Sequence, residues 1–422
     1  MQTELSAAAR LRPGVEHAEA VLRKCVHCGF CNATCPTYQL LGDERDGPRG
    51  RIYLIKQMLE SGHAGEATRQ HLDRCLSCRS CETTCPSGVE YHQLLDFGRD
   101  TLASWQPRRP AQRVFHRLLR TVLLQPRLFA PLLALGFRLR PWLPTKLAEK
   151  IPLRRSPAGS RPAMRHRRKM LLLEGCVQPS LSPATNAATA RVFDRFGISI
   201  VTAPAAACCG ALDFHLDAQE AGRSRARRNI DAWWPAIEAG AEAILVSASG
   251  CGAFVKDYGL ILAEDPQYAA RAAQVSALAR DPVEVLRAEP RLDLFLASAA
   301  GEQRLVFHSP CSLQHGQRLA GAVETLLQSF GFQLAAVEDA HLCCGAAGTY
   351  ALTQPELSER LRREKLARLT ASAPAQILTA NVGCQCHLDA VATVPVRHWI
   401  EVLDEALARA ETSKTNRTAG TS

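Results

Sequence analysis

The sequence lacks the glycine-rich fingerprints through which many proteins bind nucleotides and flavins. Its 422 residues contain no GxGxxG run after an expected strand and no GxxxxGKS/T phosphate loop. The chain therefore offers no evident nucleotide or flavin site of its own.

The N-terminal residues do not match the pattern of a targeting signal. Its first ten residues, MQTELSAAAR, contain no basic stretch followed by an apolar core, so we expect neither a signal peptide nor a membrane span at this end. The 17 cysteines are also too few, in a chain of this length, for a secreted disulfide scaffold. We therefore expect reduced thiols and a cytoplasmic protein.

Acidic residues are almost missing from one stretch. Residues 108–169 contain 17 Lys or Arg and one acid, Glu149, whereas the rest of the chain has 34 basic and 40 acidic residues. A single basic segment on an acidic body indicates a local docking strip. Its aromatic residues are too few for stacking on single-stranded nucleic acid, so we expect no nucleic acid partner. They are Phe115, Phe129, Phe137 and Trp142.

A long hydrophobic run is missing from the same stretch. Residues 128–137 are apolar, but ten residues interrupted by Pro131 cannot span a bilayer. The flanking arginines are Arg113, Arg117, Arg120, Arg138 and Arg140. The stretch resembles an interfacial amphipathic segment, and two interpretations stay open: contact with an anionic membrane surface, or a linker wrapped over an acidic partner.

Cysteine is present in a fixed pattern. Residues 25–36 read CVHCGFCNATCP and residues 75–86 read CLSCRSCETTCP, and both match CxxCxxCxxxCP, the run typical of paired 4Fe-4S clusters. Three thiolates at this spacing can surround one cluster, while the fourth, held away by an extra residue and the proline, reaches the neighbouring cluster. We therefore expect Cys25, Cys28, Cys31 and Cys85 on one cluster, and Cys75, Cys78, Cys81 and Cys35 on the other. Structural zinc is the alternative, but two identical four-cysteine runs fit a single tetrahedral ion poorly.

The segment between the two runs predicts helices. Residues 47–59, GPRGRIYLIKQML, read as a turn followed by a helix, and a second helical stretch starts near Tyr91. A long helical connection argues against a compact β-rich ferredoxin. Arg49 and Arg51 either balance cluster charge or are solvated residues at a helix start, and the sequence leaves both interpretations open.

An internal repeat follows. MLLLEGC at 170–176 corresponds to LVFHSPC at 305–311, CCG at 208–210 to CCG at 343–345, and ILVSASGC at 244–251 to ILTANVGC at 377–384. A match over several blocks indicates duplication. Each copy reads as strands alternating with helices, so we expect two α/β lobes with mostly parallel sheets and with cysteines just after strand ends.

The repeat carries a second group of candidate ligands. They are Cys176, Cys208, Cys209 and Cys251 in the first copy, and Cys311, Cys343, Cys344 and Cys384 in the second, with Cys386 as an additional thiol. A vicinal disulfide, inert thiols and a zinc site are the structural alternatives. The functional hypothesis is a further cluster or redox site in the second lobe, with His308 and His387 as ligands, proton carriers or ordinary surface histidines.

On these residues the chain resembles, over nearly its whole length, the iron-sulfur subunits of bacterial glycolate oxidase (glycolate dehydrogenase). The shared parts are the two CxxCxxCxxxCP runs, the GPRGRI turn, the basic middle and the two CCG lobes. The resemblance implies an α+β multidomain fold, with an N-terminal helical ferredoxin-type domain followed by two duplicated α/β CCG lobes. We expect the ferredoxin-type domain at 1–104, a basic linker at 105–168, CCG lobes at 169–300 and 301–410, and a disordered tail at 411–422.

The resemblance also implies a function. The chain would be the electron-transfer subunit of a flavin-dependent dehydrogenase for a 2-hydroxyacid, glycolate or D-lactate, with two 4Fe-4S clusters and a further cluster in a CCG lobe. It would pass electrons from FAD-binding partner subunits to a non-NAD membrane acceptor such as a quinone, without catalytic residues of its own. A peripheral position on the cytoplasmic face of the inner membrane would follow.

Related iron-sulfur subunits give the alternative function. In heterodisulfide reductase and anaerobic glycerol-3-phosphate dehydrogenase the same two parts recur, and the CCG lobes of such a protein could themselves be catalytic. The heterodisulfide reductase pattern ends in CxxC, however, whereas this chain has only Cys251 in the first lobe and Cys384-Gln-Cys386 in the second. The departure argues against the unusual cluster of that family.

Overall fold

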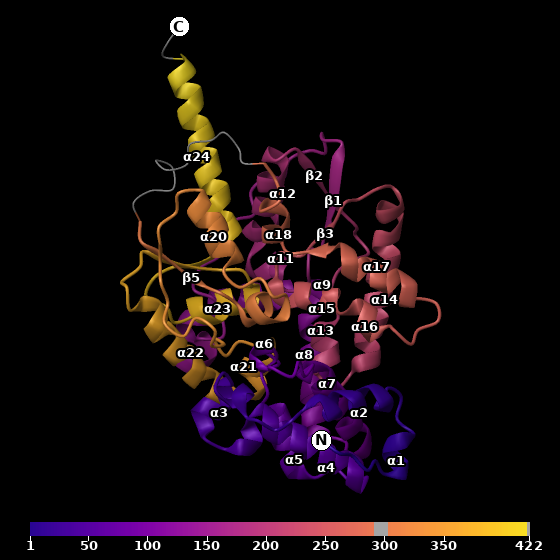
Figure 1. Cartoon of the computed structure of the whole chain (residues 1–422). Helices are drawn as coiled ribbons and strands as arrows, with labels where there is room; N and C mark the ends of the chain where they lie inside the picture. The colour runs from indigo at the N-terminus through magenta and orange to yellow at the C-terminus, as the bar shows by residue number, and fades with distance from the viewer. Residues whose placement is uncertain (291–302, 420–422) are drawn as a thin grey trace. The chain divides into compact units, whose positions relative to one another are not determined.

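The computed structural model describes residues 1–290 and 303–419, and Figure 1 colours them by position in the chain. They form two compact units. The first comprises Met1–Arg120, Leu212–Gln219 and His341–Lys365, and the second comprises Thr121–Ala211, Glu220–Ala340 and Leu366–Ser422. The expected lobe boundary at 300 and 301 lies outside the described residues.

The first unit is helical, and none of its described residues forms a strand. Its N-terminal helices are α1 (Ala7–Arg10), α2 (Val15–Lys24), η1 (Phe30–Asn32), α3 (Pro36–Leu41), η2 (Glu44–Asp46), α4 (Pro48–Ser61), α5 (Glu66–Asp73), α6 (Ser80–Thr84) and α7 (Tyr91–Trp105). Proline in the first turn favours the starts of α3 and α4. Leu22, Ile55, Leu72 and Leu94 are fully buried in the core between these helices. The predicted helical N-terminal domain is confirmed.

The second unit contains two four-stranded sheets, one from each repeat copy. The strands are β1 (Arg168–Leu172), β2 (Ile198–Thr202), β3 (Ile244–Leu245), β4 (Ala279–Arg280), β5 (Leu305–His308), β6 (Leu334–Ala335), β7 (Gln376–Thr379) and β8 (Val396–His398). The orders are β2-β1-β3-β4 and β6-β5-β7-β8, and every pairing is parallel. The identical order confirms the predicted duplication and the parallel α/β lobes.

Helices connect the strands of each copy. In the first copy they are α11 (Gln178–Leu181), α12 (Pro183–Arg195), α13 (Ala211–His215), α14 (Gln219–Glu238), α15 (Ser249–Lys256), α16 (Tyr258–Ile261), α17 (Ala269–Leu278) and α18 (Pro282–Leu286). In the second they are the π-helical turn η4 (Ser312–Gly316), α20 (Ala322–Ser329), α21 (Tyr350–Thr353), α22 (Pro355–Thr370), α23 (Val382–Asp389) and α24 (Trp399–Ala419). Both sheets contribute to one hydrophobic core, because α12 of the first copy packs against α24 of the second.

Polar bonds also join the copies within this unit. Thr185 of α12 donates from its hydroxyl to the buried Glu401 carboxylate of α24 at 2.6 Å, and Arg191 forms an ion pair with Asp404. The Nε2 atom of His398 lies 3.0 Å from the carbonyl oxygen of Ser247. The two copies therefore share one folded body.

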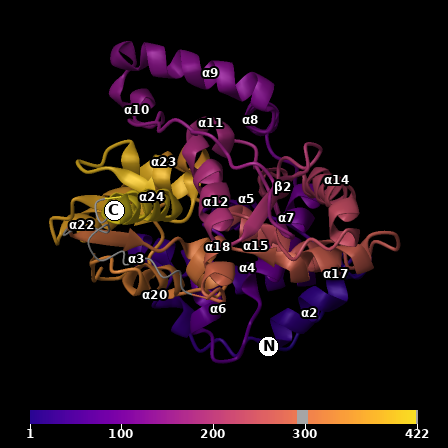
Figure 2. The same ribbon diagram turned by 90° about the horizontal axis from the view of Figure 1, so that it is seen from above.

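The first part of the expected basic linker, residues 110–148, is mostly helical. It forms α8 (Pro110–Leu123), α9 (Pro126–Leu139), η3 (Arg140–Trp142) and α10 (Thr145–Ala148). Neither α8 nor α9 has a buried residue, and Figure 2 shows α9 and α10 at the edge of the second unit, outside its sheets. Among the described residues, no single helix is long and apolar enough to cross a membrane. The segments Pro110–Leu123 and Pro126–Trp142 reach that length and composition only together, and the chain bends between them.

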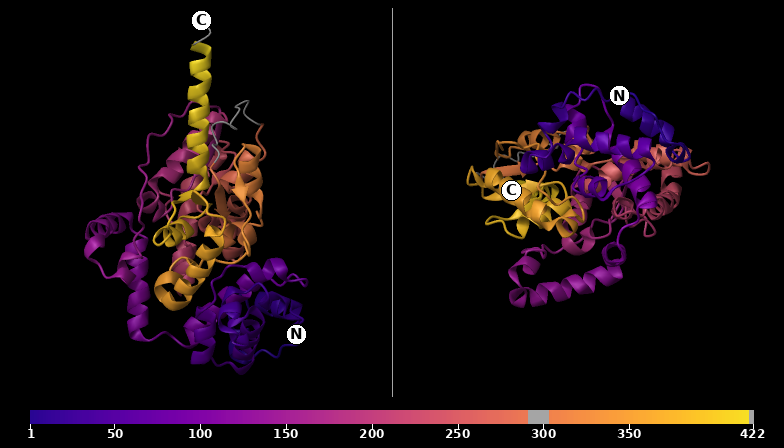
Figure 3. Two further views of the ribbon diagram at one scale, coloured as in Figure 1. Left: turned by 90° about the vertical axis from the view of Figure 1, so that its left-hand side faces the viewer. Right: turned by 90° about the horizontal axis from the view of Figure 1, so that it is seen from below.

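The expected disordered tail needs a correction. Helix α24 continues through Ala419, and its end extends away from the rest of the second unit in Figures 1 and 3. The hydroxyls of Thr412 and Ser413 donate to carbonyl oxygens one turn earlier, at 3.0 Å each, and Glu411 pairs with Arg195. Local bonding therefore extends the helix beyond the buried Ala410. Residues 420–422 lie outside the described part.

Candidate metal centres

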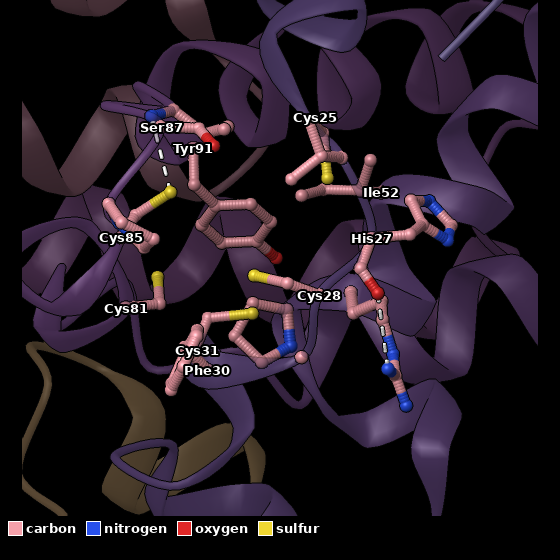
Figure 4. A pocket seen from close by; sticks show the side chains of 16 residues that line it. Cys25, His27, Cys28, Phe30, Cys31, Ile52, Cys81, Cys85, Ser87 and Tyr91 are labelled. Carbon is pink, nitrogen blue, oxygen red and sulfur yellow. Dashed lines mark hydrogen bonds between the residues drawn. The ribbon is translucent and has the colours of Figure 1, made fainter.

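Four cysteines from both runs line a cavity in the first unit. They are Cys25, Cys28 and Cys31 of the first run and Cys85 of the second, with Cys81 also on the wall. Cys25 follows the end of α2, Cys31 lies in η1, and Cys85 follows the end of α6. The sulfur atoms converge on one space in Figure 4. This set is the one predicted for the first cluster.

A second cavity in the same unit contains the complementary set. Its cysteines are Cys75, Cys78 and Cys81 of the second run and Cys35 of the first. Cys35 precedes α3, while Cys75 follows α5. Cys81 and the buried ring of Tyr91 line both cavities, and the Tyr91 hydroxyl lies 3.8 Å from the Cys75 sulfur. The sequence identified Tyr91 only as a helix start.

The two runs share their backbone conformation as well as their spacing. His27 and Ser77, at the same position of each run, have φ values of 56° and 52°, and Gly29 and Arg79 have φ values of 86° and 59°. Three of these four are not glycine, and such residues adopt left-handed conformations only where the surroundings impose them. The loops are thus curled in the same way, which turns three sulfurs of each run inward.

The chemistry of the donors fits iron-sulfur clusters better than a single ion. One zinc ion would require its ligand atoms to lie close together. Among the described residues, the sulfurs of neither cysteine set all lie within 4.8 Å of one another. Burial raises the pKa of Cys31 to about 11 and that of Cys81 well above its usual range. Such thiols become thiolates only when positive charge replaces lost hydration, and a bound cluster supplies that charge.

The structure separates the two arginines of the GPRGRI turn. Arg51 is buried and lines the second cavity, whereas Arg49 lines the first, is partly exposed and pairs with Glu44 at 2.6 Å. The interpretation of both as solvated residues is therefore wrong for Arg51.

The four cysteines of the first repeat copy come together in the second unit. The Cys208 sulfur is in hydrogen-bond contact with the sulfurs of Cys176 and Cys209. These contacts lower the pKa of Cys208 and raise the pKa values of Cys176 and Cys209. The Cys209 sulfur also contacts Cys251. No disulfide joins any of the 17 cysteines, all of which lie in the described ranges. The four cysteines of the first copy each follow a strand of that copy by a few residues, as the sequence predicted.

Both CCG motifs need their glycine for the same reason. Gly210 and Gly345 have φ values of 99° and 88°, and a side chain at either would lie within 2.7 Å of a backbone oxygen, that of Gly222 or Ser358. The N–H group of each glycine donates to the sulfur of the first cysteine of its pair, at 3.4 Å in both copies. The turn thus directs one N–H group at a thiol.

The cysteines of the second copy divide between the two units. Cys343 and Cys344 are buried in the first unit, while Cys311, Cys384 and Cys386 belong to the second. The Asn381 amide lies 3.5 Å from the Cys384 sulfur. His308 and His387 are buried, so the interpretation of these histidines as ordinary surface residues is wrong.

Comparison with known proteins agrees with the two kinds of cysteine site. A family model described as a 4Fe-4S dicluster domain matches residues 21–89, and a cysteine-rich domain matches residues 170–256 and again 305–389.

The glycolate oxidase iron-sulfur subunit of Escherichia coli (strain K12) is 56% identical, over 97% of this chain and 100% of that protein. The probable glycolate oxidase iron-sulfur subunit of Bacillus subtilis (strain 168) is 32% identical, over 87% of this chain and 88% of that protein. Lactate utilization protein A of Shouchella clausii (strain KSM-K16) is 24% identical, over 54% of this chain and 95% of that protein. The chain thus belongs to the family of glycolate oxidase iron-sulfur subunits.

Proposed function

We propose that this chain is the electron-transfer subunit of a glycolate-oxidising complex, in which FAD-binding partner subunits oxidise the 2-hydroxyacid to the 2-oxoacid. The observation that carries the proposal is the pair of cysteine-lined cavities with the common wall of Cys81 and Tyr91. Bound clusters supply one-electron chemistry, which can divide the electron pair released by a flavin. The absence of a nucleotide fingerprint in this sequence agrees with a flavin on a partner.

The proposed ligand sets cross between the runs. Cys25, Cys28, Cys31 and Cys85 hold one cluster, and Cys75, Cys78, Cys81 and Cys35 hold the other. The residues of this chain position the sulfurs, exclude water from the buried thiolates and keep the two sites adjacent. The lining of each cavity supports this assignment.

The test is chemical analysis and electron paramagnetic resonance of the complex, purified without oxygen. We expect two interacting reduced clusters in the N-terminal region, and Cys28→Ser should remove one of them together with glycolate-dependent reduction of the acceptor. Flavin reduction by glycolate should persist, because it takes place on the partner. An unchanged iron content in Cys28→Ser would contradict the ligand assignment, and normal acceptor reduction without that cluster would contradict the function.

We also propose that the CCG cysteines form a further cluster or redox site on the electron path. The convergence of Cys176, Cys208, Cys209 and Cys251, and the matched glycine N–H contacts in both copies, support a ligand or redox role over simple packing. Replacing Cys343 and Cys344 by serine should abolish transfer to the acceptor while flavin reduction survives. If that variant reduces the acceptor at the full rate, Cys343 and Cys344 have only a structural role. Should flavin reduction itself fail while flavin remains bound, the alternative of catalytic CCG lobes gains support.

The membrane position is a third part of the proposal. We propose that the complex is cytoplasmic and lies against the inner membrane, where a quinone-type acceptor is available. Helices α8 and α9 support this, because they expose leucines beside arginines in the stretch that has a single acid. Binding to an acidic partner subunit is the competing role for the same stretch, and the α9 variants described in the Discussion distinguish the two.

A further inference from the structure

The second cysteine cavity has a buried arginine in its wall, whereas the arginine that lines the first cavity is partly exposed. Arg51, in α4, is 1% exposed and lines the cavity of Cys35, Cys75, Cys78 and Cys81. A buried charge is costly unless it is paired or performs a task. The contacts of this side chain indicate which task it performs.

Three hydrogen bonds hold the guanidinium in place. Its Nε atom donates to the carbonyl oxygen of His71 at 2.7 Å, and its Nη2 atom donates to the Thr37 hydroxyl at 3.1 Å and to Asp46 at 3.5 Å. The Thr37 hydroxyl also lies 3.3 Å from the Cys35 sulfur. One hydroxyl therefore connects the arginine to a proposed ligand.

The counter-charge is shared, so positive charge remains. Asp46 is fully buried, and its carboxylate accepts from Arg74 at 2.9 Å and lies 2.9 Å from the Nδ1 atom of His71, besides its longer contact with Arg51. Two guanidinium groups thus face one carboxylate beside the second cavity. Burial lowers the pKa of Arg51, but the thiols of Cys75 and Cys35, with Tyr91 and Asp46, outweigh burial and hold it above its ordinary value.

The first cavity has a different electrostatic setting. Arg49 is 34% exposed and its charge is matched by Glu44, at 2.6 Å. Its Nη1 atom donates to the carbonyl oxygen of His27 at 3.3 Å. Solvent and the ion pair with Glu44 therefore screen the charge of Arg49, whereas the charge of Arg51 is buried in the wall of its cavity.

We propose that Arg51 and Asp46 set the reduction potential of the cluster bound by Cys35, Cys75, Cys78 and Cys81, and do not set that of the other cluster. Reduction adds one negative charge inside the ring of four thiolates, and a fixed positive charge nearby in a low-dielectric site favours that addition. Arg51 raises the potential and Asp46 lowers it. The two residues thus make the two sites unequal. The inference rests on the proposed ligand sets.

The test is potentiometric titration followed by electron paramagnetic resonance on the purified complex, with each signal assigned through Cys28→Ser and Cys78→Ser. Arg51→Met should shift the second cluster to a more negative potential, and Asp46→Asn should shift it to a more positive one. Arg51→Lys keeps the charge and should stay closest to the unaltered protein. Arg49→Met is the matched control, and it should leave the second cluster unchanged.

Opposite shifts from neighbouring residues exclude a purely structural effect, which would have no reason to depend on the sign of the charge removed. If Arg51→Met fails to retain the cluster, Asp46→Asn still tests the inference. An unchanged or more negative potential of the second cluster in Asp46→Asn would overturn it. Equal shifts of both clusters would also overturn it. If the unaltered protein contained no iron at the proposed sites, the ligand assignment itself would be refuted.

Discussion

Asp281 is a buried acid at the start of α18, far from the cysteine runs in sequence. Its Oδ1 atom accepts from the N–H group of Val283 at 3.1 Å, and Glu284 completes the capping box from the other side. The buried Oδ2 atom has no hydrogen-bond partner among the described residues. Burial raises the pKa of this carboxyl to about 7, so the folded protein favours the protonated acid.

We expect this residue to make stability fall as pH rises. Because the folded pKa is near 7 and the ordinary value is 3.8, its stabilisation is complete below about pH 4 and is lost as the pH rises through 7. The full loss is on the order of 4 kcal/mol. Denaturant unfolding of Asp281→Asn at pH 5 and pH 8 should show a smaller pH dependence than that of the unaltered protein. Glu284→Gln, at the same cap, should retain most of it, and an unaltered slope in Asp281→Asn would contradict the assignment.

At the scale of single residues, the sequence predicted the cysteines but not their surroundings. Spacing alone predicted which thiols belong together, and each predicted set lines one cavity, although Cys81 lines both. Tyr91, Thr37 and Asp46 could not be identified in this way, because their roles come from side chains that only the fold brings together. The difference between Arg49 and Arg51 arises similarly, from which side of α4 is covered.

Helix α9 presents an apolar stripe to solvent. Leu128, Leu132, Leu135 and Leu139, at helical spacing, are each 40–52% exposed, and Trp142 beyond them is 78% exposed. The intervening residues Phe129 and Phe137 are less exposed, on a helix that contacts α11. An outward leucine stripe with Arg127 and Arg138 at its ends fits an interfacial helix at an anionic bilayer.

The stripe can be tested with vesicles that contain anionic lipid. Leu132→Ser with Leu135→Ser should weaken binding of the complex at least roughly tenfold, since each buried CH₂ group contributes about 0.8 kcal/mol. Leu260→Ser, at a similarly exposed leucine of α16, is the control and should bind normally. If the double variant keeps its vesicle binding but loses its partner subunits, the stripe docks a protein instead.

Helix α24 consists of a packed part and a polar extension. Trp399, Ile400, Leu403 and Leu407 have no exposed surface and belong to the shared core. Leu403→Ala should therefore lower the free energy of unfolding by about 2–5 kcal/mol.

Deleting residues 411–422 should cost less than about 1 kcal/mol, because the ion pair of Glu411 with Arg195 that it removes is partly exposed. Denaturant titration of both variants measures the difference, and a large loss on deletion would show that the extension contributes to packing. The sequence missed this extension because its polar composition reads as disorder, while a helix already nucleated by the core continues at little cost.

At the scale of the molecule, the duplication could be predicted from the sequence, but the fusion of the copies could not. Matching blocks predicted two lobes, and the identical strand orders confirm them. Nothing in the pattern indicated that one core would include both sheets. It also did not indicate that residues 341–365 of the second copy would belong to the first unit. Those features depend on which helix faces meet, and apolar periodicity does not specify a partner.

A single copy should consequently fail to fold. A polypeptide of residues 169–290 would expose the face of α12 that α24 covers, and would leave Thr185 and Arg191 without Glu401 and Asp404. We expect it to bind a hydrophobic dye and to lack a cooperative unfolding transition, whereas the whole chain unfolds cooperatively in this region. A compact, cooperatively unfolding fragment would contradict the shared core.

The crossing of the cysteine runs has a consequence for how the protein is made. Cys85 lies 54 residues after Cys31, and Cys35 lies 40 residues before Cys75. Under the proposed assignment, each cluster links distant parts of the chain, and neither cluster can obtain all four ligands until both runs have been synthesised and brought side by side. Each bound cluster also restricts the loop that carries the ligands of the other. Neither cluster should therefore bind to a chain that ends between the two runs, and loading should begin only after the second run has been synthesised.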